Sequence, residues 1–251
     1  MPKSGGASSA ARVFPAGRAV LLYAFAAPEL AGRRFSVEGR KLHAVRYGRL
    51  ALLVGFADRQ TYAGDQLEQL RGDAEWLRTE ARIHERAAER ASAHAAVVPA
   101  RLLSVYGSSD ALEQAVRSAY VRWSRSLARL AGKREYVVHA FRGPHAAPDL
   151  DSYLLRVSAR AARSNRLLVP KAPPPIADAV QAVWKACAAS AGAVRPLQRS
   201  TTRGALGSVA YLLDEGGEEA LRATVAAGAA AAAPLGVTYY LEGPRLPFTF
   251  A

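Results

Sequence analysis

The sequence predicts an α+β protein with two domains, of which the C-terminal one is ferredoxin-like. Three observations support this fold class. Short apolar runs of strand length occur beside two long segments that carry apolar residues at helical spacing. The second half of the chain has its elements in the order β-α-β-β-α-β. The chain has 251 residues and half of them are apolar, which is enough for two hydrophobic cores.

The first domain is expected to begin with strands. A leader of residues 1–17, rich in Gly, Ser and Ala, is predicted to be disordered. The apolar run Val20–Ala26 indicates a buried strand, and Leu42–Arg46 and Leu50–Phe56 indicate two more. Gly48 lies between the last two runs and can adopt the positive φ angle of a tight turn. We therefore expect a hairpin there.

A long amphipathic helix is expected next. Asp73 is a suitable N-cap, and the helical pattern continues to about Ala95. The apolar stripe recurs at steps of three and four residues and consists of Leu77, Ala81, His84, Ala88, Ala91 and Ala95. Arginines and glutamates occupy most of the opposite face. This pattern is typical of a helix that packs one side against a sheet.

The first domain then closes with a strand and a second helix. Val97–Val105 is predicted to be extended, and Pro99 within it favours an edge position in the sheet. Ser109–Leu130 has apolar residues spaced for one helical face, and Gly132 is suited to end that helix. The first domain is accordingly assigned to residues 18–132.

The second domain is assigned to residues 133–242. Its elements are expected to be strand Tyr136–Phe141, helix Ile176–Ala189, paired strands Val194–Gln198 and Leu206–Leu213, helix Gly216–Ala232 and strand Val237–Leu241. A further helix, Leu150–Leu168, is treated as an insertion. Without it the order predicts an antiparallel ferredoxin-like sheet with two helices on one face.

The chain is strongly basic. It has 34 Lys and Arg residues against 21 Asp and Glu residues, so its formal net charge is +13. Such an excess attracts acidic partners over long distances. A GC-rich coding sequence gives the same excess, because it raises Arg and Ala together. Both interpretations remain open.

Cysteine content and hydropathy restrict the protein class. Cys187 is the single cysteine, so the sequence excludes an internal disulfide and any zinc site that needs two thiolates. This composition fits a reducing cytosol. The tract Ala223–Val237 is too short and too weakly apolar to span a membrane. Ala19–Ala27 could form the core of a signal peptide, but a first strand is the favoured interpretation.

No catalytic or metal-binding pattern is found. His84-Glu85 begins like the H-E-x-x-H zinc motif, but Ala88 stands where the second histidine would be. We therefore predict that His84 is a packed, hydrogen-bonded core histidine, and we expect no catalytic residues, no metal and no cofactor. The rival hypothesis is an enzyme that uses His84 with Glu80 or Glu85 in a hydrated cleft.

A nucleic-acid-binding protein is a second alternative. Arg156, Arg160, Arg163 and Arg166 form a basic stripe on one helical face. No aromatic side chains are interleaved with them for base stacking, and amphipathic helices are commonly this basic. Nucleic acid is therefore not the expected partner.

The last residues are unusual and form the candidate interface. Residues 243–251 are predicted to be an extended tail, because two prolines stiffen the backbone. The residues proposed to contact a partner are Gly243, Pro244, Pro247, Phe248 and Phe250. Phe248 and Phe250 alternate, so an extended tail would present both on one side. The tail could dock on its own domain or offer an apolar strip to another protein.

This tail follows a Tyr-Tyr-Leu-Glu strand and resembles the ending G-P-W-P-P-Y-S-F of the gas vesicle protein F/L family (GvpF/GvpL). Further similar segments occur in the family's order: Leu22–Phe25, Tyr47–Val54, the helix with His84-Glu85, Val98–Arg101, Gly132–Val138 and Val209–Leu213. The resemblance extends from about Val20 to Ala251. Two motifs differ, since the family's R-F-G-T is RLLS at Arg101–Ser104 and its W-P-P-Y is RLPF at Arg245–Phe248.

The resemblance implies a non-enzymatic accessory or minor structural protein of gas vesicles, which are hollow protein shells that give buoyancy. It implies that the chain assists assembly by binding the hydrophobic main shell protein, with other gas vesicle proteins as further partners. The expected location is the cytoplasm, in association with gas vesicles. Our own hypothesis for the mechanism is that the tail and the cleft between the two domains supply the contact, while the arginine excess steers the encounter.

Overall fold

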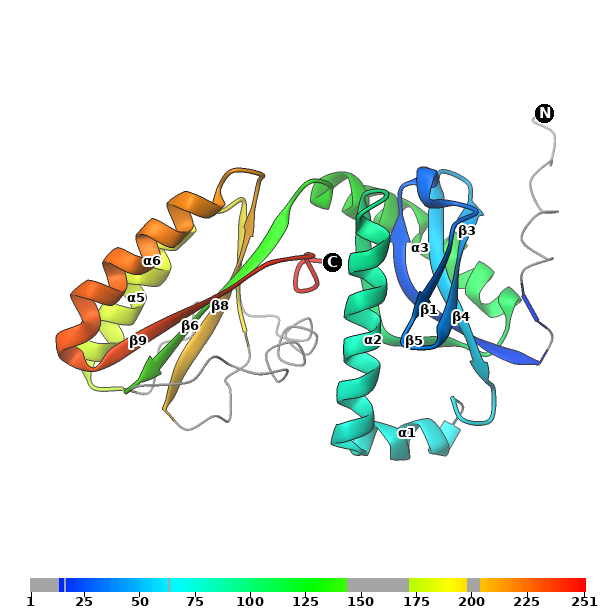
Figure 1. The fold of residues 1–251 in the computed structure, drawn as a ribbon, viewed down its shortest axis with the longest axis horizontal. Helices are drawn as coiled ribbons and strands as arrows, with labels where there is room; N and C mark the ends of the chain where they lie inside the picture. Colours follow the sequence, from blue (N-terminus) through cyan, green and yellow to red (C-terminus); the bar gives the residue numbers. More distant parts are fainter. Residues whose placement is uncertain (1–13, 16, 63, 144–171, 198–203) are drawn as a thin grey trace. The chain divides into compact units, whose positions relative to one another are not determined.

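The computed structural model describes residues 14–15, 17–62, 64–143, 172–197 and 204–251. The chain divides into two compact units, one that ends at Ala131 and one from Gly132 to Phe250 (Figure 1). Three predictions fall largely or wholly outside the described residues. These are the leader of residues 1–17, the helix Leu150–Leu168, and the basic stripe that this helix would carry.

The described part of the N-terminal unit contains a five-stranded antiparallel sheet with the strand order β2-β3-β4-β1-β5. The strands are β1 (Arg18–Ala26), β2 (Arg34–Val37), β3 (Arg40–Tyr47), β4 (Leu50–Asp58) and β5 (Val97–Tyr106), and a short 3-10 turn, η2 (Pro28–Leu30), follows β1. β1 is buried from its second residue onward, as its unbroken apolar run predicted. β5 is an edge strand, as Pro99 indicated.

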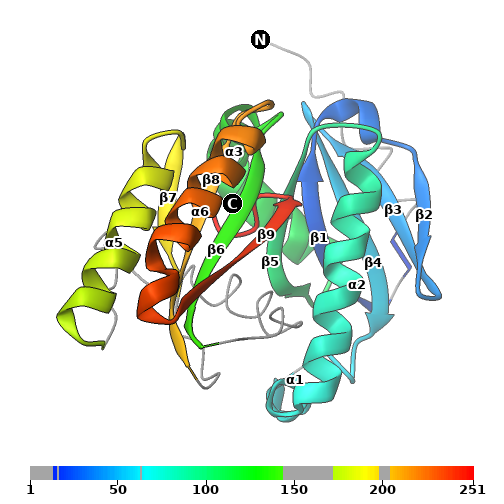
Figure 2. The same ribbon diagram turned by 60° about the vertical axis from the view of Figure 1, so that its left-hand side comes forward.

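Helices pack on both faces of this sheet (Figures 1 and 2). They are α2 (Ala74–Ser92) and α3 (Ser109–Leu130), whereas α1 (Gly64–Gly72) packs against α2. Arg40 and Tyr47 lie an odd number of positions apart on β3, so their side chains point to opposite faces. Arg40 contacts Glu80 of α2, whereas Tyr47 lies against Tyr120 of α3. α2 and α3 therefore cover opposite faces.

Local sequence signals explain where α2 begins and which face it buries. The Asp73 carboxylate accepts the backbone N–H groups of Glu75 and Trp76 at 2.9 and 3.1 Å, as an N-cap should. The middle of the predicted apolar stripe, which includes Ala81 and Ala88, is completely buried. α3 begins and ends at the predicted residues, and Gly132 after it has a φ angle of 72°.

β3 and β4 form the predicted hairpin. Tyr47 pairs with Leu50 across the two residues Gly48 and Arg49, and Gly48 has a φ angle of 59°. A Cβ atom at Gly48 would lie 2.9 Å from the hydroxyl oxygen of Tyr120, which also accepts the N–H of Arg49. Glycine is thus needed for the turn and for the close approach of α3.

The described part of the C-terminal unit contains a four-stranded antiparallel sheet with the order β7-β8-β6-β9. The strands are β6 (Arg134–Arg142), β7 (Ala193–Pro196), β8 (Ala205–Leu213) and β9 (Val237–Arg245). The helices are α5 (Pro174–Ala188) and α6 (Glu218–Ala232), and the short 3-10 turn η3 (Ala233–Leu235) follows α6. The predicted mixture of helices and antiparallel sheets is thus present.

α5 and α6 cover one face of this sheet with an apolar core. Trp184 of α5 and Tyr211 of β8 are fully buried, and the Tyr211 hydroxyl donates to the carbonyl oxygen of Trp184 at 3.2 Å. The two helices pack closely where α6 has Gly228. A Cβ atom at that position would lie 2.4 Å from a methyl carbon of Val183. The absence of a side chain at Gly228 therefore sets the distance between the helices.

Two elements of the N-terminal unit were not predicted. β2 has four residues, of which only Val37 is buried, so its sequence gives no apolar alternation. α1 has no buried residue and therefore lacks the apolar stripe that reveals a helix. Within the described ranges, no helix is both long and apolar enough to cross a membrane.

Candidate functional site

The residues proposed for the interface do not form one extended tail. β9 continues to Arg245, so Gly243 and Pro244 belong to the last strand. A turn follows, in which the N–H of Phe248 donates to the carbonyl of Leu246 at 2.8 Å. The N–H of Phe250 donates to that of Pro247 at 3.2 Å. We call residues 246–250 the C-terminal turn.

The backbone at Gly243 has no room for a side chain. Its φ angle is 126°, and a Cβ atom would lie 2.8 Å from both the carbonyl oxygen of Glu135 and a ring carbon of Tyr136. Glycine is therefore required where β9 passes β6. The next residue, Pro244, is exposed, and it lacks the N–H that an inner strand would need.

A buried carboxylate holds the C-terminal turn. Glu135 accepts the backbone N–H of Thr249 at 2.8 Å with one oxygen and the Thr249 hydroxyl at 2.7 Å with the other. Both residues are at most 1% exposed. Hydrogen bonds to an ionised group are stronger than neutral ones, so this contact replaces part of the hydration that the buried carboxylate has lost. It also explains why the chain turns here instead of extending.

Arg195 of β7 makes a second contact with the turn. Its guanidinium donates to the carbonyl oxygen of Thr249 and lies 5.6 Å from the centre of the Phe250 ring. Phe248 and Phe250 are 5% and 3% exposed. Of the five residues proposed for the interface, Pro244 alone is exposed.

The face of the C-terminal sheet that holds the C-terminal turn also carries a polar cluster, which the spacing of residues in the sequence did not reveal. His139 of β6 has Nδ1 2.8 Å from the Ser208 hydroxyl oxygen and Nε2 3.1 Å from a Glu242 oxygen. Arg245 contacts the other Glu242 oxygen at 2.9 Å. The order resembles a serine–histidine–acid relay, but Ser208, His139 and Glu242 are each no more than 6% exposed. In this structure the hydroxyl of Ser208 is not presented to a substrate.

His84 occupies the position that the sequence predicted. It is 3% exposed, and its Nε2 donates to the carbonyl oxygen of Ala100 at 3.0 Å. Burial lowers its pKa to about 4, so the ring is neutral at pH 7. No group of three potential metal-ligating side chains occurs within the described ranges.

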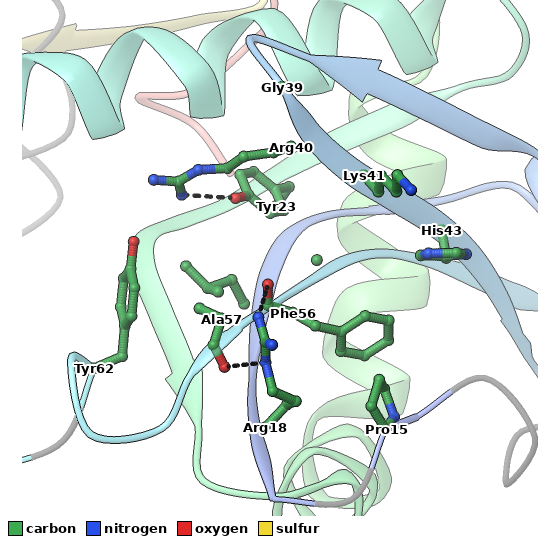
Figure 3. Close-up of a pocket in the computed structure, with 12 residues that line it drawn as sticks. Pro15, Arg18, Tyr23, Gly39, Arg40, Lys41, His43, Phe56, Ala57 and Tyr62 are labelled. Atoms are coloured by element: carbon green, nitrogen blue, oxygen red, sulfur yellow. Dashed lines mark hydrogen bonds between the residues drawn. The ribbon is translucent and has the colours of Figure 1, made fainter.

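A second polar cluster lies between the N-terminal sheet and α2. The carboxylate of Glu80 is bound by the guanidinium of Arg40, with one contact at 2.7 Å, and by the hydroxyl of Tyr62 at 3.1 Å. Arg40 also donates to the Tyr23 hydroxyl oxygen at 3.2 Å (Figure 3). Burial first, and the charge of Glu80 next, raise the pKa of Tyr62 to about 12.

Sequence reasoning missed Glu135, Thr249 and Arg195 because their contacts depend on strand register. Glu135 and Thr249 are 114 positions apart, a separation to which no periodicity applies. The one available signal was Glu135 itself, an acidic residue at the start of a strand that continues Tyr-Val-Val.

Comparisons with known proteins agree with the resemblance. The family model described as "Gas vesicle synthesis protein GvpL/GvpF" matches residues 19–251. The crystal structure of the gas vesicle protein GvpF from Anabaena sp. PCC7120 is similar at a TM-score of 0.64 and 14% identity, covering 93% of this chain and 98% of that one. The crystal structure of GvpF from Microcystis aeruginosa is similar at a TM-score of 0.60 and 15% identity, covering 92% of this chain and 98% of that one. At such identities the structural likeness concerns the fold. No curated protein sequence matches the chain.

Proposed function

Because the chain belongs to the GvpL/GvpF family of gas vesicle synthesis proteins, we propose that it is a non-enzymatic accessory protein that assists gas vesicle assembly by binding the hydrophobic main shell protein. The observation that carries this proposal is the extent of the family match, which begins at residue 19 and includes the C-terminal turn. We place the protein in the cytoplasm, in association with gas vesicles and their other proteins.

The physical requirement for such a protein is simple. A shell subunit with a large apolar surface aggregates unless a partner covers that surface until assembly. Among the described residues, the large apolar side chains that are well exposed are Val121, Leu235 and Tyr240, which do not make up a broad apolar surface. Within the described part of the chain, an apolar contact would therefore come from residues that are buried in this structure.

The C-terminal turn is the proposed source of that contact, with Gly243 and Pro244 on the strand that leads into it. The polar contacts that hold the turn include those of Thr249 with Glu135 and Arg195. Each hydrogen bond to a charged group contributes about 1.5–3 kcal/mol. Reburying two phenylalanines against an apolar partner recovers about 1.5–3 kcal/mol for each. Because both rings are already buried, this only restores their own contribution, and release of the turn requires contacts with the shell protein that replace the lost hydrogen bonds.

We also infer that the C-terminal unit is a ferredoxin-like domain. Its strand order supports this assignment, since the first strand of the unit, β6, lies between the last two, β8 and β9. Packing of α5 and α6 against the core residues of the sheet adds support. The formal net charge of +13 is proposed to steer the encounter with acidic surfaces of vesicle components.

Complementation tests this function. The gene would be deleted in the source organism, and the full chain or a chain without residues 246–251 would be restored. We expect intact vesicles with the full chain and few with the truncated one. Normal vesicle formation after deletion of the gene would contradict a role in assembly.

A further inference from the structure

The N-terminal sheet opens between two of its inner strands. β3 and β4 are paired from Tyr47 and Leu50 as far as Leu42 and Gly55, where their pairing ends. β3 nevertheless begins at Arg40 and β4 continues to Asp58. Beyond Leu42 and Gly55, β3 pairs only with β2 and β4 only with β1. A crevice of about 500 Å³ lies at this split (Figure 3).

The Arg40 side chain lines the crevice and is anchored to α2. If pairing continued, Arg40 would face Ala57 across the sheet. Its guanidinium is instead held by Glu80 of α2, whose carboxylate is 3% exposed, and by the Tyr23 hydroxyl. This partly buried ion pair joins the first residue of β3 to the helix. Next to it, Lys41 of β3 and Phe56 of β4 are not paired with each other, and the carbonyl oxygen of Phe56 accepts a hydrogen bond from the guanidinium of Arg18 at 3.5 Å.

The crevice carries positive charge. Arg18, Arg40 and Lys41 line it, and no carboxylate is among the described residues that do so. Arg40 is neutralised by Glu80, but neither Arg18 nor Lys41 lies in an ion pair within the described ranges. Arg18 donates to the carbonyl oxygen of Ala57 at 3.0 Å, which directs its guanidinium across the opening (Figure 3).

Electrostatics and apolar walls both restrict the ligand. His43 also lines the crevice, and its pKa is lowered first by burial and then by the charges of Arg34 and Lys41. The contribution of these two charges agrees with a positive potential in the crevice. Phe56 and Tyr62 add aromatic surface to the walls. A ligand that fits must therefore combine negative charge, apolar groups and backbone-like hydrogen-bonding atoms.

From this combination we propose that the crevice between β3 and β4 binds an extended acidic segment of a partner protein. A carboxylate of the segment lies between Arg18 and Lys41, and an adjacent apolar side chain packs beside Phe56, whose ring already contacts Phe14 and His43. The segment's backbone pairs with the open ends of the two strands. This site goes beyond the proposed function, because it uses the N-terminal unit and does not depend on binding of the shell protein.

Peptide binding tests this site directly. The probe is an end-blocked Gly-Glu-Leu-Glu-Thr-Gly peptide with a fluorescent label, and the reference is the same peptide with Gln in place of Glu. Fluorescence anisotropy with the full chain should show affinity for the acidic peptide at least about tenfold higher than for the Gln peptide. Equal affinity for both peptides would overturn the proposal.

Two charge reversals locate the binding. Lys41→Glu should weaken binding about tenfold or more, whereas Lys185→Glu, an exposed site on α5, should change it by less than about twofold. Lys41 is exposed, so an unchanged thermal unfolding transition is expected for both variants. Equal losses from both variants would show non-specific attraction instead. Displacement of the peptide by inorganic phosphate at the same concentration would assign the crevice to free anions and contradict the peptide site.

Discussion

The carboxylate of Glu135, at the start of β6, accepts both the backbone N–H and the hydroxyl of Thr249, in the turn that ends the described chain. The two residues are 114 positions apart, so one buried acidic group joins the beginning and the end of the C-terminal unit. We propose that this contact also keeps the two phenylalanines of the turn covered until a partner binds.

Thr249→Val tests the contribution of this contact to stability. The variant keeps the backbone N–H bond but removes the hydroxyl donor from one oxygen of a buried carboxylate. We expect a loss of about 1–3 kcal/mol in the free energy of unfolding, measured by urea denaturation. Thr224→Val on α6, whose hydroxyl bonds only to its own helix, is the control and should change stability by about 0.5 kcal/mol or less. Equal effects of the two substitutions would show that the Glu135 contact contributes little.

His84 should make the protein less stable in weak acid. Its pKa is about 4 in the folded state, against 6.5 as the ordinary value, so the unfolded chain binds a proton first as the pH falls. The stability that depends on the neutral ring is complete above pH 6.5 and is lost as the pH falls towards 4. This loss amounts to about 3 kcal/mol.

Urea denaturation at pH 7 and pH 4 measures this loss. His84→Gln retains a donor for the carbonyl oxygen of Ala100 but does not titrate, so its stability should fall by less than that of the original chain. His94→Gln, at an exposed ring, serves as the control and should leave the pH dependence unchanged. The same pH dependence in all three proteins would contradict a buried neutral His84.

Gly228→Ala should destabilise the C-terminal unit although alanine favours helices. The gain in helix propensity is about 1 kcal/mol, but the new methyl group would overlap a methyl carbon of Val183. We expect a net loss of about 1–2 kcal/mol by urea denaturation. In a Val183→Ala background the added methyl group has space, so the same substitution should there be neutral or stabilising. A stabilising effect in the original chain would show that α5 and α6 can move apart freely.

Leu103 has a backbone conformation that favours glycine. Its φ angle is 57°, within the part of β5 where pairing with β1 is interrupted between Ser104 and Pro99. A side chain in this region costs about 1–2 kcal/mol. Leu103→Gly should therefore cost less stability than Leu102→Gly, a substitution at its neighbour, which is also partly buried. We expect a difference of at least about 1 kcal/mol. Equal losses from both substitutions, measured by chemical denaturation, would contradict strain at Leu103.

Local chemistry was sufficient to predict most of the secondary structure. The Asp73 cap, the glycine turn at Gly48 and the apolar spacing of Ser109–Leu130 each act over a few residues, and the structure confirms all three. β2 and α1 were missed because they bury few or no side chains and so have no apolar pattern.

The candidate site was less predictable because its contacts are long-range. The prolines near the end of the chain indicated a stiff segment, but not that Glu135 would hold Thr249 in a turn. The Ser208–His139–Glu242 cluster likewise depends on the register of three strands, which no spacing within one strand reveals. The split between β3 and β4 likewise lies beside an ion pair between residues 40 positions apart.

Co-purification tests the central claim most directly. The tagged chain would be expressed together with the main gas vesicle shell protein from the same source. One experiment would use the full chain, and the other a form without residues 246–251. A cooperative unfolding transition would establish that the truncated form folds. If it does not fold, the full-length variant Phe248→Ala would be used in its place. We expect the full chain to retain the shell protein. The truncated form, or the Phe248→Ala variant, should retain at least about tenfold less shell protein. Absence of the shell protein from the purified full chain would contradict the proposed binding, and equal retention by both forms would contradict the role of the C-terminal turn.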